Sequence, residues 1–505
     1  MLDSFARIAL GLTLLPLSLT SAQGARPDPA SIARAVDSLA TRAVADGLAP
    51  ALGVAVIMDG RTTYMKSHGK ADVTAGVPAD DGTLWYIAST SKSLTGFGVA
   101  LLAHQGAIRM DAPITTLLPK ARWNPAVRAE SLTLAHFLSH THRVNDNAVV
   151  QSAAFTGEIP EARWPELIAL AGQAPTNDLV YGNFGYNVAA MVIDANRPEG
   201  WKRFLEQKVY QPIGMRDTYT RVSGLNAKRI AKPHRFRADG SYITEPFFKT
   251  DATMNSAGGH LSTLRDLARW TIVQADSGMI DGKRVFPAEA VALSHRLIAK
   301  QTRDQAKRFA FFDREGWGAG WDIGTYEGER MVSRFGSYHT TRSHLSFLPA
   351  RRIGVVVMSS GGLSALTDIV AAFAYDLEAG RPDARQRTEQ RMDELRKRFG
   401  DSRRNVAVQD STRAARQRQP LSRPLTDFAG VFEEPSFGKL TFTARAGRLD
   451  FRWGALHGPA EIFDAAKGQL RIETAGSGSV VTFSFQGEGP AQSIDMQGVS
   501  FKRVR

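Results

Sequence analysis

The sequence contains no cysteine. This absence excludes a disulfide framework, a thiolate zinc site, an iron–sulfur cluster and a cysteine nucleophile. The chain also lacks a Gly-x-Ser-x-Gly elbow, a Gly-x-x-x-x-Gly-Lys phosphate loop and a His-Glu-x-x-His helix. The most common esterase fold, the P-loop NTPases and the zincins are therefore excluded as well.

Long hydrophobic runs are also missing, and the most apolar stretch lies at the N-terminus. Arg7 precedes an apolar run from Ile8 to Thr20, and small residues follow at Thr20-Ser21-Ala22. Thirteen residues are too few to cross a bilayer, but they suit a signal peptide. We expect residues 1–22 to be a signal peptide and the mature chain to be periplasmic or secreted, with no transmembrane segment. A buried N-terminal helix is the alternative.

Positive charge is plentiful but unevenly placed. The formal net charge is +13, and more than half of the excess lies between Arg385 and Arg423. This stretch has no aromatic interleaving, so it does not favour a nucleic-acid partner. We interpret residues 381–425 as a basic linker or a solvated outer helix, with a helix predicted at Glu389 to Phe399.

With 505 residues, the chain is long enough for two or three domains. Hydrophobic periodicity predicts one α/β (α+β) domain of about 350 residues, whose sheet is built from both ends with helical segments inserted between them and in which neighbouring strands can be antiparallel. The predicted elements are a helix around Ile32 to Ala43, a hairpin of 54–58 and 62–66 with a type I′ turn at Asp59-Gly60, a helix at 89–105, and strands at 343–348 and 353–358.

From Asp427 the pattern changes to short alternating segments. Residues such as Leu440, Phe442, Phe451 and Trp453 alternate with polar ones, and Gly and Pro separate the segments. This pattern predicts a small all-β domain over 427–505, either a barrel or a sandwich.

His136, His140 and His142 form the only dense histidine cluster. Two histidines four residues apart share a helix face and could hold a metal ion. No acidic residue lies close in the sequence, so the alternative is that these histidines pack and form hydrogen bonds within their own segment. We predict no metal site.

The most informative segment is Ser89-Thr90-Ser91-Lys92 at the start of a predicted helix. Ser-x-x-Lys places a serine and a lysine one turn apart, and a buried neutral lysine can take the proton of a serine hydroxyl. Two further copies, Ser67/Lys70 and Ser436/Lys439, do not open apolar helices.

Two other motifs accompany Ser89 and Lys92. Tyr181-Gly182-Asn183 precedes an apolar helix, and Arg334-Phe335-Gly336-Ser337 enters a late strand. In this order and spacing, the three motifs resemble those of the serine β-lactamase and penicillin-binding-protein superfamily, most of all its class C β-lactamase-like branch. Flanking segments at 132–141, 211–218 and 257–269 are also similar to that family. The resemblance covers about residues 30 to 378, and the C-terminal β domain resembles small lipocalin-like domains.

The resemblance implies roles for single residues. Ser89 would be the nucleophile, Lys92 its base and Tyr181 the donor of a proton to the leaving group. Asn183, Arg334, Gly336 and Ser337 would bind substrate, with the backbone N–H groups of Ser89 and Ser337 forming an oxyanion hole. Arg334 would hold a substrate carboxylate, with Arg143, His339 and Arg342 adding to the positive field. No cofactor is implied.

The third motif departs from the family. Arg334 stands where members usually carry lysine or histidine, and bulky residues 338–342 replace a small continuation. Arginine keeps the charge but does not shuttle a proton. We therefore predict a hydrolase of small-molecule or peptide substrates, cleaving peptide or ester bonds. A true β-lactamase and an acylable sensor with little turnover are the alternatives, and the oligomeric state is left open.

Overall fold

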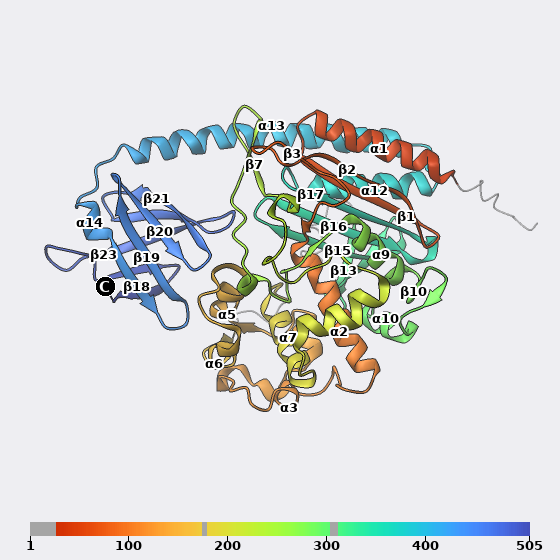
Figure 1. Ribbon diagram of the computed structural model, residues 1–505, viewed down its shortest axis with the longest axis horizontal. Helices are drawn as coiled ribbons and strands as arrows, with labels where there is room; N and C mark the ends of the chain where they lie inside the picture. Colours follow the sequence, from red (N-terminus) through yellow and green to blue (C-terminus); the bar gives the residue numbers. More distant parts are fainter. Residues whose placement is uncertain (1–26, 174–178, 303–311, 505) are drawn as a thin grey trace, which may run out of the picture.

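The computed structural model describes residues 27–173, 179–302 and 312–504. The predicted signal peptide lies outside the described residues. Figure 1 shows an α/β domain and a separate β-barrel, which are connected by one long helix. The expected α/β fold with an antiparallel sheet and a small all-β domain is therefore confirmed.

The central sheet has nine strands in the order β12-β13-β14-β15-β16-β17-β1-β2-β3, and neighbouring strands are antiparallel. N-terminal strand β1 pairs with late strand β17, so both ends of the domain build one sheet, as predicted. Asp59 and Gly60 have φ of 50° and 73°, which confirms the left-handed hairpin turn. The strands are β1 (Ala51–Met58), β2 (Arg61–Asp72), β3 (Val77–Pro78), β12 (Ala299–Lys300), β13 (Asp313–Trp317), β14 (Asp322–Tyr326), β15 (Glu329–Tyr338), β16 (Thr341–Leu348) and β17 (Ile353–Ser359).

Helices cover both faces of the sheet. Strand β1 is buried along its whole length: Val54 and Val56 face one hydrophobic cluster, while Ala55 and Ile57 face the other. Alternate side chains of a strand point to opposite faces, so a strand that is apolar throughout belongs in the middle of three layers. The covering helices are α1 (Pro29–Ala45), α12 (Ala365–Glu378) and α13 (Ala384–Gln417) on one face, and α2 (Ser91–His104), α9 (Leu264–Ala275) and α10 (Ala288–Ser294) toward the other.

A largely helical region lies between α2 and α9 in the sequence and packs beside α2. Its helices are α3 (Ile114–Leu117), α4 (Leu134–Leu138), α5 (Asn147–Gln151), α6 (Trp164–Ile168), α7 (Phe184–Asn196) and α8 (Gly200–Leu205). Four short strand pairs accompany it, formed by β4 (Trp85–Tyr86) with β9 (Leu261–Ser262), β5 (Val144–Asn145) with β6 (Gly172–Gln173), β7 (His234–Phe236) with β8 (Tyr242–Thr244), and β10 (Met279–Ile280) with β11 (Lys283–Arg284).

The C-terminal domain is a closed eight-stranded barrel. Its interior is filled by the alternating residues that predicted it, including Leu440, Phe442, Phe451 and Phe483. The short helix α14 (Leu425–Phe428) precedes it, and its strands are β18 (Gly430–Glu434), β19 (Gly438–Arg445), β20 (Arg448–Trp453), β21 (Leu456–Asp464), β22 (Gln469–Glu473), β23 (Gly478–Ser484), β24 (Ser493–Met496) and β25 (Val499–Arg503).

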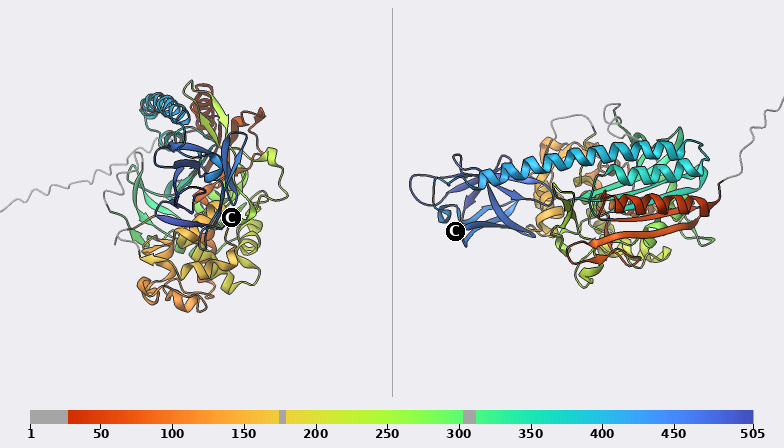
Figure 2. Two further views of the ribbon diagram at one scale, coloured as in Figure 1. Left: turned by 90° about the vertical axis from the view of Figure 1, so that its left-hand side faces the viewer. Right: turned by 90° about the horizontal axis from the view of Figure 1, so that it is seen from above.

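The basic segment expected as a linker is the 34-residue helix α13, which runs along the α/β domain and reaches the barrel (Figure 2). Its first half packs through a stripe of buried residues that includes Met392, Leu395 and Phe399, at helical spacing. Its end contacts the barrel, where the Gln417 side chain donates to the Ile462 carbonyl over 3.2 Å.

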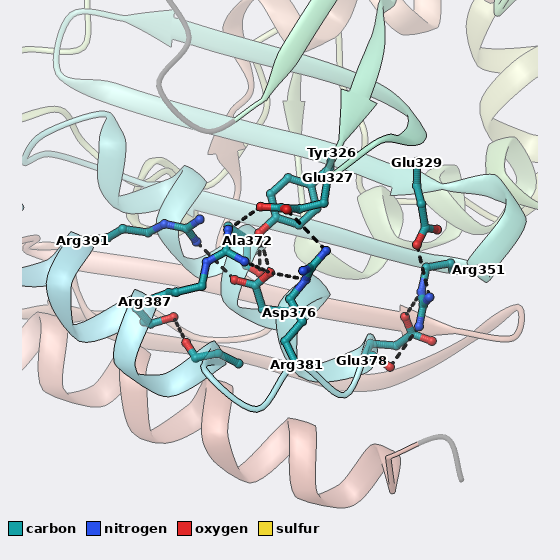
Figure 3. A network of polar contacts seen from close by, with 12 residues as sticks. Tyr326, Glu327, Glu329, Arg351, Ala372, Asp376, Glu378, Arg381, Arg387 and Arg391 are labelled. Atoms are coloured by element: carbon teal, nitrogen blue, oxygen red, sulfur yellow. Dashed lines mark hydrogen bonds and ion pairs between the residues drawn. The ribbon is translucent and has the colours of Figure 1, made fainter. Parts of the chain in front are cut away.

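A buried carboxylate fixes the first half of α13. Asp376 of α12 is fully buried and accepts a hydrogen bond from the Tyr326 hydroxyl over 2.7 Å. Figure 3 shows that the guanidinium groups of Arg381, Arg387 and Arg391 converge on it, at 3.3, 3.7 and 3.4 Å. A buried charge needs such partners. The arginines of this segment are therefore partly structural, which the composition alone did not reveal.

The barrel also touches the α/β domain directly. The Ala455 N–H donates to the Thr156 carbonyl over 2.8 Å, and the Lys439 N–H donates to the Glu158 carboxylate over 3.1 Å. Within 27–173, 179–302 and 312–504, no helix has the length and apolar character needed to cross a membrane.

Candidate active site

Ser89 lies in a tight turn at the start of α2. Residues Ala88–Thr90 form a 3₁₀ turn that leads directly into the helix, and Ala88 has a φ of 46°. The N-terminal end of a helix stabilises negative charge. Strand β15 approaches this turn through Gly336, where a Cβ would lie 2.1 Å from the Ile87 carbonyl oxygen. Only glycine allows this approach, which places the third motif beside Ser89.

Lys92 points from the first turn of α2 toward Ser89. Its Nζ lies 3.1 Å from Ser89 Oγ and 2.8 Å from both Asn183 Oδ1 and the Ala257 carbonyl oxygen. The side chain is fully buried, and burial lowers the pKa of Lys92 to about 8. The structure therefore brings the serine, the lysine and the asparagine of the first two motifs together, with an amine that can be neutral near physiological pH.

Tyr181 completes the group. Part of its ring is exposed, but its hydroxyl is directed inward and accepts a hydrogen bond from the Arg334 guanidinium over 2.5 Å. Burial alone would raise the pKa of this phenol, but the positive charges of Arg334 and Lys92 outweigh it and lower the pKa to about 8. Arg334 thus acts on the phenol oxygen at the centre of the site.

The N–H groups of the Arg334 guanidinium are mostly engaged in contacts within the protein. The group is 2% exposed: Nε donates to the Ser89 carbonyl over 2.9 Å, and one terminal nitrogen donates to Asp322 over 3.1 Å. Asp322 also pairs with Arg314 at 2.8 Å. A carboxylate fork needs two free parallel N–H donors. The geometry does not provide this fork at Arg334, because its nitrogens already face Tyr181, Ser89 and Asp322.

Aromatic rings hold Tyr181 in place. The Trp317 ring stacks on it with centroids 5.2 Å apart, and the His140 ring lies 4.6 Å away. His140 is buried, its pKa is held well below the usual range by burial, and its Nδ1 accepts from the Gly182 N–H over 3.4 Å. A neutral imidazole in this position packs against the phenol without adding charge.

The histidine cluster divides into separate structural roles. The Nδ1 of His136 accepts from the Thr133 N–H over 3.0 Å, and that of His142 accepts from the Val144 N–H over 3.0 Å. In the part of the chain that the structure describes, no group of three or more His, Asp or Glu side chains is arranged to hold a metal ion. The alternative of a metal at His136, His140 and His142 is not supported.

A cavity of about 710 Å³ opens in front of Ser89. Strand β14 pairs with β15 only as far as Ser333, so the edge of β15 from Arg334 to Ser337 borders this cavity and the turn of Ser89. The wall is strongly basic, with Arg314, Arg334, Arg342 and Arg398 against Asp322 and Asp368. Ser89 and Ser337 both line this cavity.

The two other Ser-x-x-Lys copies are elsewhere and differ in structure. Ser67 and Lys70 both lie on β2, and the Ser67 hydroxyl donates to the Asp80 carbonyl over 3.1 Å. Ser436 lies in the turn before β19, where its N–H donates to Glu434 over 2.6 Å. Neither copy lies on a helix, in agreement with the reading of the sequence.

Several residues of the site carry no sequence signal. Asp322, Arg314 and Trp317 come from β13 and β14, and the Lys92 acceptor at Ala257 is a backbone carbonyl. A tryptophan between glycines at 316–318 was the one visible hint of a special position. No motif pointed to Asp322.

Comparisons with known proteins identify the family of the α/β domain. The family model described as Beta-lactamase matches residues 36–379, more than half of the chain. The chain belongs to the beta-lactamase family. The match begins within α1, runs to the end of α12 and ends before α13, so the barrel lies outside the family region.

Relatives of this beta-lactamase-family chain extend the comparison. It is 24% identical to penicillin-binding protein 4 of Amycolatopsis lactamdurans, over 66% of this chain and 87% of the relative. It is 25% identical to the D-alanyl-D-alanine-carboxypeptidase/endopeptidase AmpH of Escherichia coli K12, over 51% of this chain and 66% of the relative. The structure of an octameric penicillin-binding-protein homologue from Pyrococcus abyssi matches with a TM-score of 0.58 at 17% identity, covering 93% of this chain and 99% of that one, so the fold is shared beyond the family region.

Proposed function

We propose that this protein is an exported serine hydrolase that cleaves peptide amide or ester bonds through an acyl-Ser89 intermediate. The observation that carries the proposal is the buried Lys92 amine, 3.1 Å from Ser89 Oγ and with its pKa lowered to about 8 by burial. A serine hydroxyl becomes a nucleophile when a neighbouring base takes its proton.

In the acylation step, Ser89 Oγ attacks the substrate carbonyl carbon while its proton passes to Lys92. The N–H groups of Ser89 and Ser337 receive the oxyanion; removal of one such donor typically costs about 3–4 kcal/mol of transition-state stabilisation. The bond to the leaving group then breaks, Tyr181 gives its proton to the leaving nitrogen or oxygen, and the proton held by Lys92 passes to Tyr181. Asn183 holds the Lys92 amine through its side-chain oxygen, 2.8 Å away.

In the deacylation step, a water molecule adds its hydroxyl to the acyl carbon and its proton returns through Lys92 and Tyr181 to Ser89. The products are a carboxylic acid and the free serine. These steps call for neither a metal ion nor an organic cofactor. Arg334 takes part by holding the phenol of Tyr181 and keeping its pKa low.

The relatives support a hydrolase of peptide bonds, since one of them is named a D-alanyl-D-alanine-carboxypeptidase/endopeptidase. Export is proposed from the apolar run Ile8 to Thr20. The stereochemical preference follows from neither observation, so both D and L substrates belong in the test.

The experiment is a hydrolysis panel with purified protein and its Ser89→Ala variant. The panel contains p-nitrophenyl esters, D- and L-aminoacyl p-nitroanilides, linear peptides and nitrocefin. We expect hydrolysis of at least one ester or amide class that is lost in Ser89→Ala. Turnover confined to nitrocefin would indicate a true β-lactamase, and stable labelling without turnover would indicate a sensor.

A further inference from the structure

A second cleft of about 410 Å³ lies between the α/β domain and one end of the barrel. Residues 147–155 and the end of β15 form one wall. The turns 474–477 and 496–499 of the barrel, together with Trp453 and Phe501, form the other. The barrel thus completes a space that the α/β domain does not enclose by itself.

This second cleft meets the catalytic cavity at Ser337. Ser337, the second expected oxyanion donor, lines both spaces. Tyr181, the expected proton donor to the leaving group, lines the catalytic cavity but not the second cleft. We expect a leaving group to lie near Tyr181, which leaves the side of Ser337 and the barrel for the part of the substrate that stays on Ser89.

The catalytic cavity and the second cleft differ in the charge of the side chains that line them. The catalytic cavity carries Arg314, Arg342 and Arg398. Among the described residues that line the second cleft, none is Lys, Arg, Asp or Glu; its walls are aromatic and aliphatic side chains interspersed with the hydroxyls and amides of Gln151, Ser477 and Gln497. A pocket of this composition binds uncharged groups with apolar side chains and a few hydrogen-bonding atoms.

Close backbone contact holds the barrel at this position. Gly476 has a φ of 97°, and a Cβ there would lie 2.7 Å from the His339 Cα. His339 lies in the turn between β15 and β16, two residues after Ser337, and burial lowers its pKa, which keeps its side chain neutral. The barrel turn 474–477 therefore packs directly against the end of β15, close to the expected oxyanion donor Ser337.

We infer that the second cleft is the binding site for the acyl part of the substrate, and that it takes an extended, uncharged acyl group such as a short peptide segment with apolar side chains. The inference rests on the proposed function, because it assigns the leaving group to the Tyr181 side. It gives the barrel a direct part in substrate selection.

The test keeps the leaving group constant and changes only the acyl side. The substrates are p-nitrophenyl esters of acetate, N-acetyl-alanine and N-acetyl-phenylalanyl-alanine, with the phenylalanine replaced by aspartate or lysine in two further esters, in both alanine configurations. We expect kcat/KM to rise at least tenfold from acetate to the phenylalanyl-alanyl ester in one configuration. The aspartyl and lysyl esters should lose most of this gain.

Val499→Trp fills the barrel side of the cleft, because Val499 is half-buried and lines it. It should lower kcat/KM for the phenylalanyl-alanyl ester at least tenfold and leave the acetate ester within about twofold. The control is Val480→Trp, at a half-buried valine of the barrel that does not line the cleft, and it should change neither. Gly476→Ala should act like Val499→Trp, whereas Gly489→Ala, with a φ of 100° and open space around its Cβ position, should not.

The outcomes separate the two proposals. Ser89-dependent hydrolysis of the acetate ester with no gain on the longer esters, or equal losses on both in Val499→Trp, would overturn the acyl-site inference alone. No hydrolysis of any ester together with no labelling of Ser89 by a fluorophosphonate would overturn the proposed function, and the inference with it.

Discussion

The Arg334 guanidinium donates a hydrogen bond to the Tyr181 hydroxyl over 2.5 Å, and it does so from a fully buried position. The same guanidinium holds the Ser89 carbonyl and Asp322. A permanent positive charge beside a phenol favours the phenolate, which makes the tyrosine a better proton donor to a leaving group. In this site the arginine of the third motif therefore tunes a residue of the second.

The first prediction concerns pH. Lys92 accepts the Ser89 proton only when its amine is deprotonated, and burial lowers its pKa to about 8. For a p-nitrophenyl ester, whose leaving group departs without a proton, kcat/KM should therefore rise with pH and level off above about 8. The charge of Arg334 adds to this lowering of the Lys92 pKa, so Arg334→Met should move the midpoint of the profile upward.

Arg334→Lys is the matched control, since it keeps the charge and changes the shape of the donor. Its midpoint should stay near that of the wild type although its rate falls. An unchanged midpoint in Arg334→Met, measured over pH 6 to 10, would show that Arg334 does not act on the proton-transfer groups.

Lys92 and Tyr181 should share one proton path. Lys92→Ala and Tyr181→Phe should each lower kcat by about 10²-fold or more, the usual scale for loss of a positioned acid or base. Residues that act as a unit are not additive, so the double variant should lose less than the product of the two effects. Strict multiplicativity in steady-state kinetics would argue for independent roles.

Gly336 should tolerate no side chain. A Cβ at this position would lie 2.1 Å from the Ile87 carbonyl oxygen and 2.3 Å from Ser343 Oγ, so Gly336→Ala must push β15 away from the turn of Ser89. We expect kcat/KM to fall by about 10²-fold, the scale of a lost oxyanion donor. Gly172→Ala, with nothing within 4 Å of the added Cβ, is the control and should remain active. Equal activity of the two variants would contradict the packing argument.

Asp322 should be important for stability because it separates two buried guanidinium groups. Asp322→Ala leaves Arg314 and Arg334 facing each other without this carboxylate, and loss of one partner of a buried ion pair costs about 3–5 kcal/mol of the free energy of unfolding. The urea midpoint should fall accordingly. Asp111→Ala, which removes an exposed ion pair with Arg109, should leave the midpoint close to the wild-type value. A similar midpoint in both variants would show that the buried triad is not a source of stability.

Local patterns made much of the fold predictable. The turn at Asp59-Gly60 and the apolar strand 353–358 are short-range signals, and both appear as predicted. Helix α13 was harder to predict as a packed helix. Its buried face has only three large apolar side chains, those of Met392, Leu395 and Phe399, and the buried Asp376 that binds its arginines lies in another helix. Long-range ion pairs of this kind have no signature in a single sequence.

Some residues of the candidate site were likewise predictable from the sequence, and others were not. Ser89, Lys92, Tyr181 and Asn183 lie in short motifs whose resemblance to those of a known family implied that they would meet, and the structure places them in contact. The orientation of Arg334 toward Tyr181 was not predictable, because it depends on Asp322 from a neighbouring strand. The position of the barrel beside Ser337 depends on long-range contacts such as that of Gly476 with His339, which a single sequence does not reveal.

The central claim is that Ser89 is the nucleophile, and mass spectrometry tests it most directly. The full chain is treated with a fluorophosphonate, its intact mass is measured, and the modified peptide is sequenced. The account predicts a single adduct on Ser89 that forms more slowly in Lys92→Ala. An adduct on Ser67, Ser91 or Ser436 in place of Ser89, or an equal labelling rate without Lys92, would contradict it.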